Sequence, residues 1–122
     1  DYRVFLNMPF KNKIKEAQIQ KAIMEFLRFQ RIQCWRINTV GIPDGRGAFR
    51  FNNEMRGMAD ICLIFRGLSV WMEVKNSTGR QSPNQKEFQR QVEAAGGFYF
   101  LVRSVEDAVV AINQLEIQTG KK

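Results

Sequence analysis

The sequence predicts a single α/β domain in which helices flank a mixed sheet. Along the chain, the spacing of apolar residues changes between that of helices and that of strands. The 122 residues are enough for one core only, and a hydrophobic content of 44% favours a folded globular protein. We therefore expect residues 1–122 to form one domain with the order helix, three strands, helix, strand, helix.

The first helix is expected over about residues 12–30. Apolar residues recur there at the three-and-four spacing of a buried stripe: Ile19, Ala22, Ile23, Phe26 and Leu27. Glu16 lies roughly 50° from the centre of that stripe at about 100° per residue, so its side chain can face the edge of the core. A short strand is expected over 33–37. The long connection over 38–57 is rich in Gly, Asn and Arg, and its length indicates a functional segment or a small hairpin.

Two further strands, over 58–65 and 68–75, are expected to pair as a hairpin about the turn at Arg66 and Gly67. The first is a nearly continuous apolar run that Asp60 interrupts. This pairing would place residues from the two strands side by side.

The remainder of the chain predicts helix, strand and helix. Ser82, with Pro83 at the first helical position and Gln85 at the third, is typical of a helix N-terminus with a capping box. A glycine pair ends this helix, residues 98–103 form the next strand, and Ser104 caps the last helix.

Charge and composition limit the possible functions. The chain has 19 Lys and Arg against 12 Asp and Glu, and its net charge of +7 suits a polyanionic partner such as nucleic acid. Histidine is absent, which excludes Ser-His-Asp triads and every other site that needs an imidazole. We expect no membrane segment and a cytoplasmic protein, with Cys34 and Cys62 reduced.

Charged residues interrupt the predicted hairpin strands. Glu73 and Lys75 are two residues apart and share one sheet face with Trp71, while Val70, Met72 and Val74 fill the other face. This combination indicates either chemistry or an ordinary solvated ion pair worth under about 1 kcal/mol.

A metal ion would explain two carboxylates at one place. If the hairpin forms, Asp60 approaches Glu73, and two carboxylates about 4 Å apart repel each other by roughly 4 kcal/mol at an effective dielectric constant near 20. Mg²⁺ relieves such repulsion and prefers one or two carboxylates with water and phosphate oxygens. Lys75 can then hold a nucleophilic water or neutralise charge on a phosphate. The alternative for Asp60 is a turn or edge residue.

The order of these residues resembles a known nuclease signature. Gly57-Met58-Ala59-Asp60 followed by Glu73-Val74-Lys75 looks like the GxxD…ExK pattern of the PD-(D/E)XK superfamily. Four further segments are similar to its VRR-Nuc branch: Glu16–Gln20, Arg36–Gly41, Asn76–Lys86 and Ala95–Gly97. The resemblance extends from about residue 14 to about residue 113 and implies a restriction-endonuclease-like αβββαβ core.

The resemblance also implies roles for individual residues. Asp60 and Glu73 would bind Mg²⁺ or Mn²⁺ with the backbone carbonyl of Val74, and Lys75 would be the catalytic lysine. Glu16 matches an extra acidic position that helps the metal ion or its waters; its alternative is an exposed helix residue.

Other positions have two interpretations. Gln85 either reaches the site as the family glutamine does or only caps its helix. Ser77 and Thr78 either contact phosphate or are ordinary turn residues, and Arg80 is a further candidate for DNA binding. Four arginines frame or lie within the long connection and are candidates for gripping phosphates: Arg36, Arg46, Arg50 and Arg56.

These expectations together indicate a structure-selective DNA endonuclease that acts by in-line attack of water with inversion. Standalone members of the branch resemble Holliday junction resolvases, which implies a homodimer acting on four-way junctions. The alternatives are a monomeric flap or nicking nuclease, and a non-catalytic nucleic-acid-binding module on the same fold.

Overall fold

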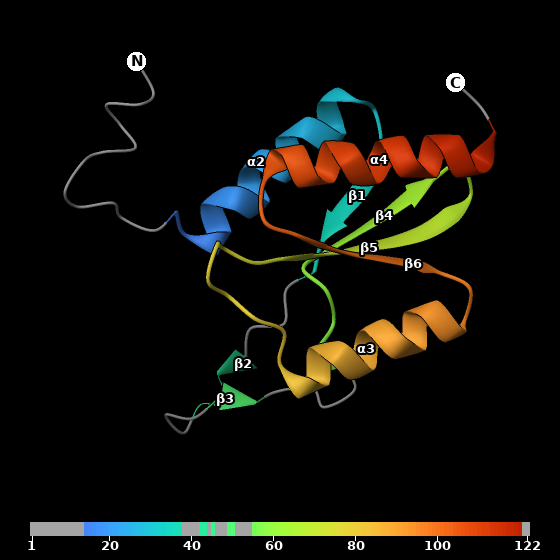
Figure 1. Ribbon diagram of the computed structural model, residues 1–122. Coiled ribbons are helices and arrows are strands. Elements are labelled where there is room, and N and C mark those ends of the chain that lie inside the picture. Colours follow the sequence, from blue (N-terminus) through green and yellow to red (C-terminus); the bar gives the residue numbers. More distant parts are fainter. Residues whose placement is uncertain (1–13, 38–41, 44, 46–48, 51–54, 121–122) are drawn as a thin grey trace, which may run out of the picture.

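The fold is built on a four-stranded mixed sheet that carries helices on both faces (Figure 1). This computed structural model describes residues 14–37, 42–43, 45, 49–50 and 55–120. The sheet has the strand order β1-β4-β5-β6. Its strands are β1 (Gln33–Arg36), β4 (Ile61–Phe65), β5 (Leu68–Val74) and β6 (Phe98–Val102). The helices are α2 (Glu16–Phe29), α3 (Pro83–Ala94) and α4 (Val105–Thr119).

The strand directions confirm the predicted mixed sheet. β1, β4 and β5 are antiparallel neighbours, whereas β6 is parallel to β5 and follows it through α3. In the long connection, β2 (Ile42–Pro43) and β3 (Phe49–Arg50) form a separate two-stranded ladder, which is the small hairpin expected from the length of this segment.

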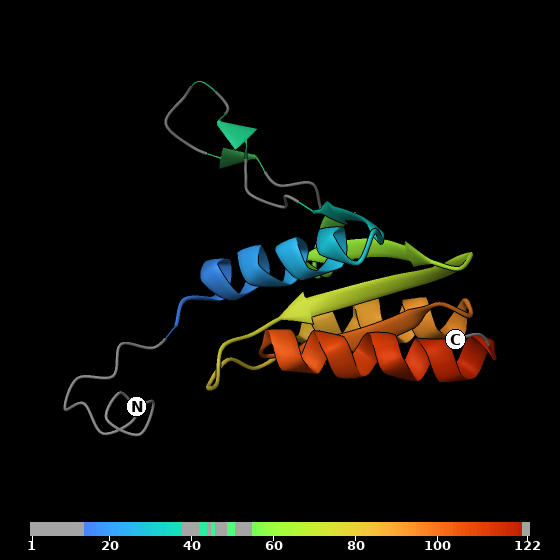
Figure 2. The same ribbon diagram turned by 90° about the horizontal axis from the view of Figure 1, so that it is seen from above.

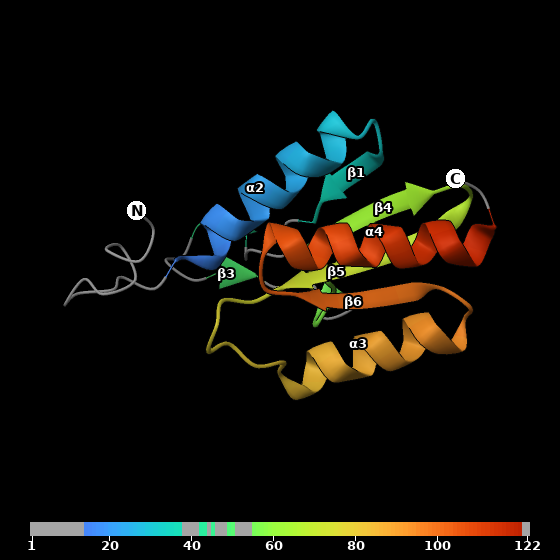
Figure 3. The same cartoon turned by 45° about the horizontal axis from the view of Figure 1, so that its top comes forward.

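Alternation along the strands separates a core face from a second face. The core face is formed by Ile61, Leu63 and Phe65 of β4. On β5 it is formed by Val70, Met72 and Val74. Helices α2 and α4 cover this face and lie beside each other (Figure 2). The second face carries α3, which runs along β6, far from β1 (Figure 3).

Five predicted boundaries were wrong. The first helix begins at Glu16, and Ile14 and Lys15 before it are not helical. β1 ends at Arg36, one residue early. β4 begins at Ile61, so Asp60 lies just before the strand and not within it. β5 ends at Val74 and β6 at Val102, each one residue before the predicted end.

No described helix is long and apolar enough to cross a membrane. Both cysteines are free thiols, as expected, and both are half-buried. The cytoplasmic location stays a prediction.

Candidate active site

The hairpin brings Asp60 and Glu73 together at one end of β4 and β5. Ile61 pairs with Met72, so the next step of the antiparallel ladder puts Asp60 opposite Glu73. The Asp60 carboxylate is also tied to β5, since its Oδ2 accepts a hydrogen bond of 2.7 Å from the Val74 N–H. Asp60 therefore continues the ladder through its side chain, although it lies outside the regular strand.

Glu73 is a buried acid on the second face of the sheet. Its relative exposure is 1%, and it is the charged residue of the described core. Burial, then the charge of Asp60 and a hydrogen bond that protonated Glu73 donates to the Asp60 carboxylate, raise the pKa of Glu73 to about 8, against the opposing effect of Lys75. The Lys75 Nζ lies 3.5 Å from Glu73 Oε2. One lysine thus does not compensate fully for two neighbouring carboxyls.

The two oxygens of Glu73 have different surroundings. Oε2 is the oxygen near Lys75, and it also accepts a hydrogen bond of 3.2 Å from Gln85 Nε2. Oε1 is buried and has no hydrogen-bond partner. With both carboxyls ionised, no proton lies between Glu73 and Asp60 to satisfy Oε1. A shared proton or a cation would satisfy it.

The carboxylate oxygens of Asp60 and Glu73 are suitable ligands for a small divalent cation. A buried, unpartnered carboxylate oxygen beside a second carboxylate is the kind of oxygen site that Mg²⁺ or Mn²⁺ occupies, with water and phosphate oxygens completing the coordination. Among the residues that the structure describes, no three acidic or cysteine side chains gather closely enough to hold a metal ion. The site therefore supplies two carboxylates, and any further ligands would be backbone oxygens, water or substrate.

The backbone conformation and close packing at position 57 require the glycine with which the motif before Asp60 begins. Its φ of +77° is in the left-handed region. A Cβ there would overlap the Asn84 carbonyl and would lie 2.9 Å from Gln85 N. The segment leading to Asp60 thus packs directly on the first turn of α3, which also carries Gln85.

Gln85 both caps its helix and contacts Glu73, while its predicted part in catalysis stays a prediction. Its Oε1 accepts a hydrogen bond of 2.9 Å from the Ser82 N–H, and its own N–H donates to Ser82 Oγ at 3.2 Å, which completes the capping box. Its Nε2 remains available and donates to Glu73. The helix cap therefore orients the amide toward the carboxylate.

Glu16 approaches Lys75 from α2. Its Oε2 accepts a hydrogen bond of 3.2 Å from the Asn76 N–H. A Cβ at Gly79 would lie 2.8 Å from this oxygen and 3.2 Å from the Lys75 Cδ, so the turn after β5 packs tightly against both side chains. Glu16 is half-buried and forms no group of three with Asp60 and Glu73 in the described part of the chain. Its assistance to a metal ion through water stays a prediction.

Sequence reasoning missed Arg103 and the specific role of Asn76. One guanidinium nitrogen of Arg103 donates to the Asn76 carbonyl at 2.6 Å and to the Gly79 carbonyl at 2.8 Å. Asn76 Oδ1 accepts from the Thr78 N–H at 3.2 Å, which forms an Asx turn, and from the Gly79 N–H at 2.8 Å. An Asn next to the lysine could have suggested that turn, whereas nothing in the sequence links Arg103 to it.

The residues predicted to bind DNA are not all near the carboxylates. Arg36 lines a hollow with Lys21 and Arg28 of α2, on the opposite sheet face from Glu73. Arg56 is exposed beside Gly57. The exposed residues Ser77 and Arg80 lie in the loop that leads to α3.

Two of the predicted arginines are described little or not at all. Arg46 lies outside the described residues. Arg50 is described only as part of β3.

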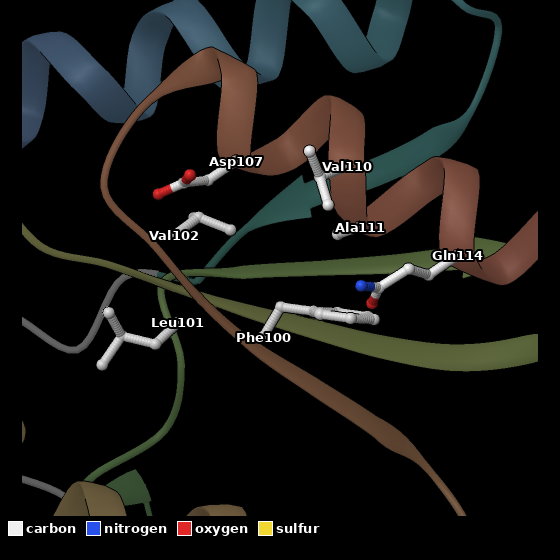
Figure 4. Close-up of a pocket in the computed structure, with 7 residues that line it drawn as sticks. All are labelled: Phe100, Leu101, Val102, Asp107, Val110, Ala111 and Gln114. Carbon is white, nitrogen blue, oxygen red and sulfur yellow. The ribbon is translucent and has the colours of Figure 1, made fainter.

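A separate hollow of about 240 Å³ lies between β6 and α4 (Figure 4). Phe100, Val110 and Gln114 are among its lining residues, and Asp107 is its acidic residue. It contains none of the predicted site residues.

No protein-family model and no curated protein matches the chain by sequence. Solved structures do match it. One described as "VRR_NUC domain" has a TM-score of 0.60 at 20% identity and covers 80% of this chain and 94% of its own. Another, "VRR_NUC domain protein", has a TM-score of 0.60 at 17% identity and covers 86% of this chain and 90% of its own. The chain therefore has the α/β, restriction-endonuclease-like fold of VRR_NUC domain proteins, as the sequence resemblance predicted.

Proposed function

We infer that the chain is a metal-dependent nuclease that hydrolyses phosphodiester bonds in DNA. The observation that carries this proposal is the buried Glu73, whose Oε1 has no hydrogen-bond partner, beside Asp60 and Lys75. A buried acid in this state destabilises the fold unless it is protonated or bound to a cation. A functional requirement for a cation at this position accounts for that cost.

In the proposed site, Asp60 and Glu73 would hold Mg²⁺ or Mn²⁺ together with the Val74 carbonyl, and Glu16 would act through water. When bound, the cation polarises the scissile phosphoryl group and lowers the pKa of an attacking water. Lys75 carries its positive charge to within 3.5 Å of Glu73, where it can orient that water or stabilise charge on the phosphate. Gln85 keeps Glu73 oriented through Oε2.

The proposed reaction is a one-step hydrolysis. The water oxygen bonds to phosphorus while the opposite bond to the leaving sugar oxygen breaks, so the configuration at phosphorus inverts. The protons of the water end on the leaving oxygen and in solvent. No covalent protein intermediate is needed, which agrees with a site that offers two carboxylates and a lysine without histidine.

For the substrate, we propose branched DNA, with four-way junctions first. Support comes from the net charge of +7 and from the resemblance of the sequence to junction resolvases. Symmetric resolution requires two sites, so this proposal includes a homodimer. A monomeric flap or nicking nuclease is the alternative within the same chemistry.

The test is cleavage of end-labelled four-way junction, flap, nicked and plain duplex DNA with Mg²⁺ or Mn²⁺. Asp60→Asn, Glu73→Gln and Lys75→Ala should each lower the cleavage rate at least about 100-fold, as expected when a charge-stabilising group is removed. Binding of uncleaved junctions should stay within several fold.

Sedimentation of the same protein separates the dimer from the monomer. Symmetric junction cuts by a dimer support resolution, and flap cuts by a monomer support the alternative. Junction binding without cleavage under every metal condition, unchanged by Glu73→Gln, would show a non-catalytic binding module instead.

A further inference from the structure

Among the described residues, no helix packs on the β1 and β4 part of the sheet face that carries Glu73. α3 packs along β6, and its Phe88 contacts Trp71 and Tyr99. On β1 and β4, the same face presents Trp35, which is 50% exposed, and Ile64, which is 42% exposed. Trp35 and Ile64 are therefore exposed apolar side chains on the sheet face that also carries the carboxylate pair.

Register places Trp35 next to the carboxylate pair. Trp35 is directly opposite Cys62, and the Ile37 N–H bonds to the Asp60 carbonyl at 2.8 Å, so Asp60 is the diagonal neighbour of Trp35 on the same face. Diagonal neighbours in an antiparallel sheet are about 7–8 Å apart. Asp60 is half-buried while Glu73 is buried, so the carboxylate pair is more open on the β4 side, toward β1.

The two tryptophans of this face differ in how they are held. Trp71 meets the Phe88 ring edge-on at 5.0 Å, and its indole N–H donates to Ser69 Oγ at 3.2 Å. Within the described residues, the Trp35 indole has neither a ring contact nor a hydrogen-bond partner. With respect to the described part of the chain, the Trp35 indole thus has an uncontacted ring face and an unbonded N–H at the open side of the site.

We propose that Trp35 is a stacking subsite for an unpaired nucleobase adjacent to the phosphate that is cut. This inference rests on the nuclease function proposed above and adds a source of its selectivity. In paired duplex, the bases stack on one another and offer no free face, whereas a branch point or single-stranded arm does. Stacking of a base on an aromatic side chain requires no particular sequence.

A nucleic-acid strand suits this surface better than a protein does. A protein subunit seated on Trp35 would also cover the diagonal position of Asp60, which is the open side of the carboxylate pair. A DNA strand that enters the site must pass this same position. The net charge of +7 further favours the polyanion.

Binding without cleavage tests the inference independently of catalysis. The probes are a fluorescein-labelled forked DNA with two unpaired arms and a fully paired duplex of equal length, each titrated in EDTA. Trp35→Ala should weaken fork binding about 10-fold, the loss expected for one base–aromatic stack, and should leave duplex binding within about 2-fold. Trp35→Phe should retain most of the affinity for the fork.

Ile64→Ala is the matched control. It removes another exposed apolar side chain of this face, four residues after Asp60 in the sequence, and should change neither affinity. In a Trp71→Phe background, the fork should quench the remaining tryptophan fluorescence, and paired duplex should quench it less.

Unchanged fork binding by Trp35→Ala, or an equal loss for fork and duplex, would overturn the inference. A shift from dimer to monomer in Trp35→Ala, seen by sedimentation without a fork-specific loss, would overturn it too, because the face would then be a contact between copies. Failure of the nuclease proposal is seen separately, as the absence of Mg²⁺- or Mn²⁺-dependent cleavage by the wild-type chain, and it leaves the binding result readable.

Discussion

At the scale of single residues, Glu73 determines how the metal-free protein responds to pH. Its pKa is raised from an ordinary 4.5 to about 8, chiefly by burial and then by Asp60. The folded state therefore holds a proton that the unfolded state releases. The resulting stabilisation is fully present below pH 4.5 and is lost as pH rises through 8.

Glu73→Gln should remove this pH dependence. Without metal, we expect the variant to melt roughly 5–10 °C above the wild type at pH 8.5 and close to it at pH 5, because a neutral amide has no proton to lose. Thermal unfolding in EDTA across this range is the measurement. Glu87→Gln on exposed α3 surface is the control and should not change the pH slope. If the melting temperatures of Glu73→Gln and wild type depend equally on pH, Glu73 is not a buried acid with a raised pKa.

The two functions of Gln85 can be separated by substitution. Gln85→Glu keeps an oxygen for the capping box but replaces the donor to Glu73 with another carboxyl. We expect at least about a 10-fold lower cleavage rate at pH 7 from the loss of a charge-stabilising contact, with little loss of stability.

Ser82→Ala is the complementary variant. It should cost about 1 kcal/mol of stability through loss of the cap and should leave the cleavage rate within about 3-fold. Rates and urea unfolding of both variants check the pair of expectations. A slow Ser82→Ala enzyme together with a normal Gln85→Glu enzyme would show that capping alone matters.

At the scale of elements, the hairpin shows why much of the site was predictable. Arg66 and Gly67 both have positive φ, at 50° and 81°, in a two-residue turn that pairs Phe65 with Leu68. That single pairing fixes every later pair of the ladder, including Asp60 opposite Glu73. Recognition of a local turn in the sequence was therefore sufficient to predict a contact between residues far apart in the chain.

The positions that sequence reasoning missed depend on packing between distant elements. Alternation along β1 puts Arg36 and Trp35 on opposite faces, but only the placement of α2 and α3 determines which face holds the site. The contact of Arg103 with the turn after β5 likewise requires β6 to lie parallel beside β5. No periodicity within one segment contains that information.

Gly57 links two elements, and its substitution should affect both stability and activity. Gly57→Ala adds left-handed strain and an overlap with the first turn of α3. We expect a stability loss of roughly 2–4 kcal/mol and a lower cleavage rate, since both Asp60 and Gln85 would shift.

Gly96→Ala controls for the strain alone. Its φ is +88°, but a Cβ there would meet nothing within 4 Å, so a loss of about 1–2 kcal/mol with normal activity is expected. Urea unfolding and cleavage assays compare the two variants. Equal effects would mean that the contact with α3 is unimportant.

At the scale of the whole molecule, the net charge of +7 should make DNA binding strongly dependent on salt. Arg56 and Arg80 lie in the segments that lead to Asp60 and α3, whereas Arg36 lies on the α2 side. Arg56→Ala and Arg80→Ala should therefore each lower the slope of log affinity against log salt by about 1, and Arg36→Ala should change it less. Titrations with labelled junction DNA at several salt concentrations measure these slopes. A larger effect of Arg36→Ala would place the DNA across the opposite face.

The most direct test of the account is a titration of the protein with Mn²⁺ at pH 8, in which electron paramagnetic resonance counts the free ion. Asp60 and Glu73 should hold one strong Mn²⁺ per chain, and Asp60→Asn or Glu73→Gln should each abolish this binding, while Glu87→Gln should keep it. Two results would contradict the account, with or without junction DNA: equal Mn²⁺ binding by the wild type and all three variants, or no Mn²⁺ binding by any of them. Either result would show that the two facing carboxyls are not a metal site, and the proposed hydrolysis would have no basis.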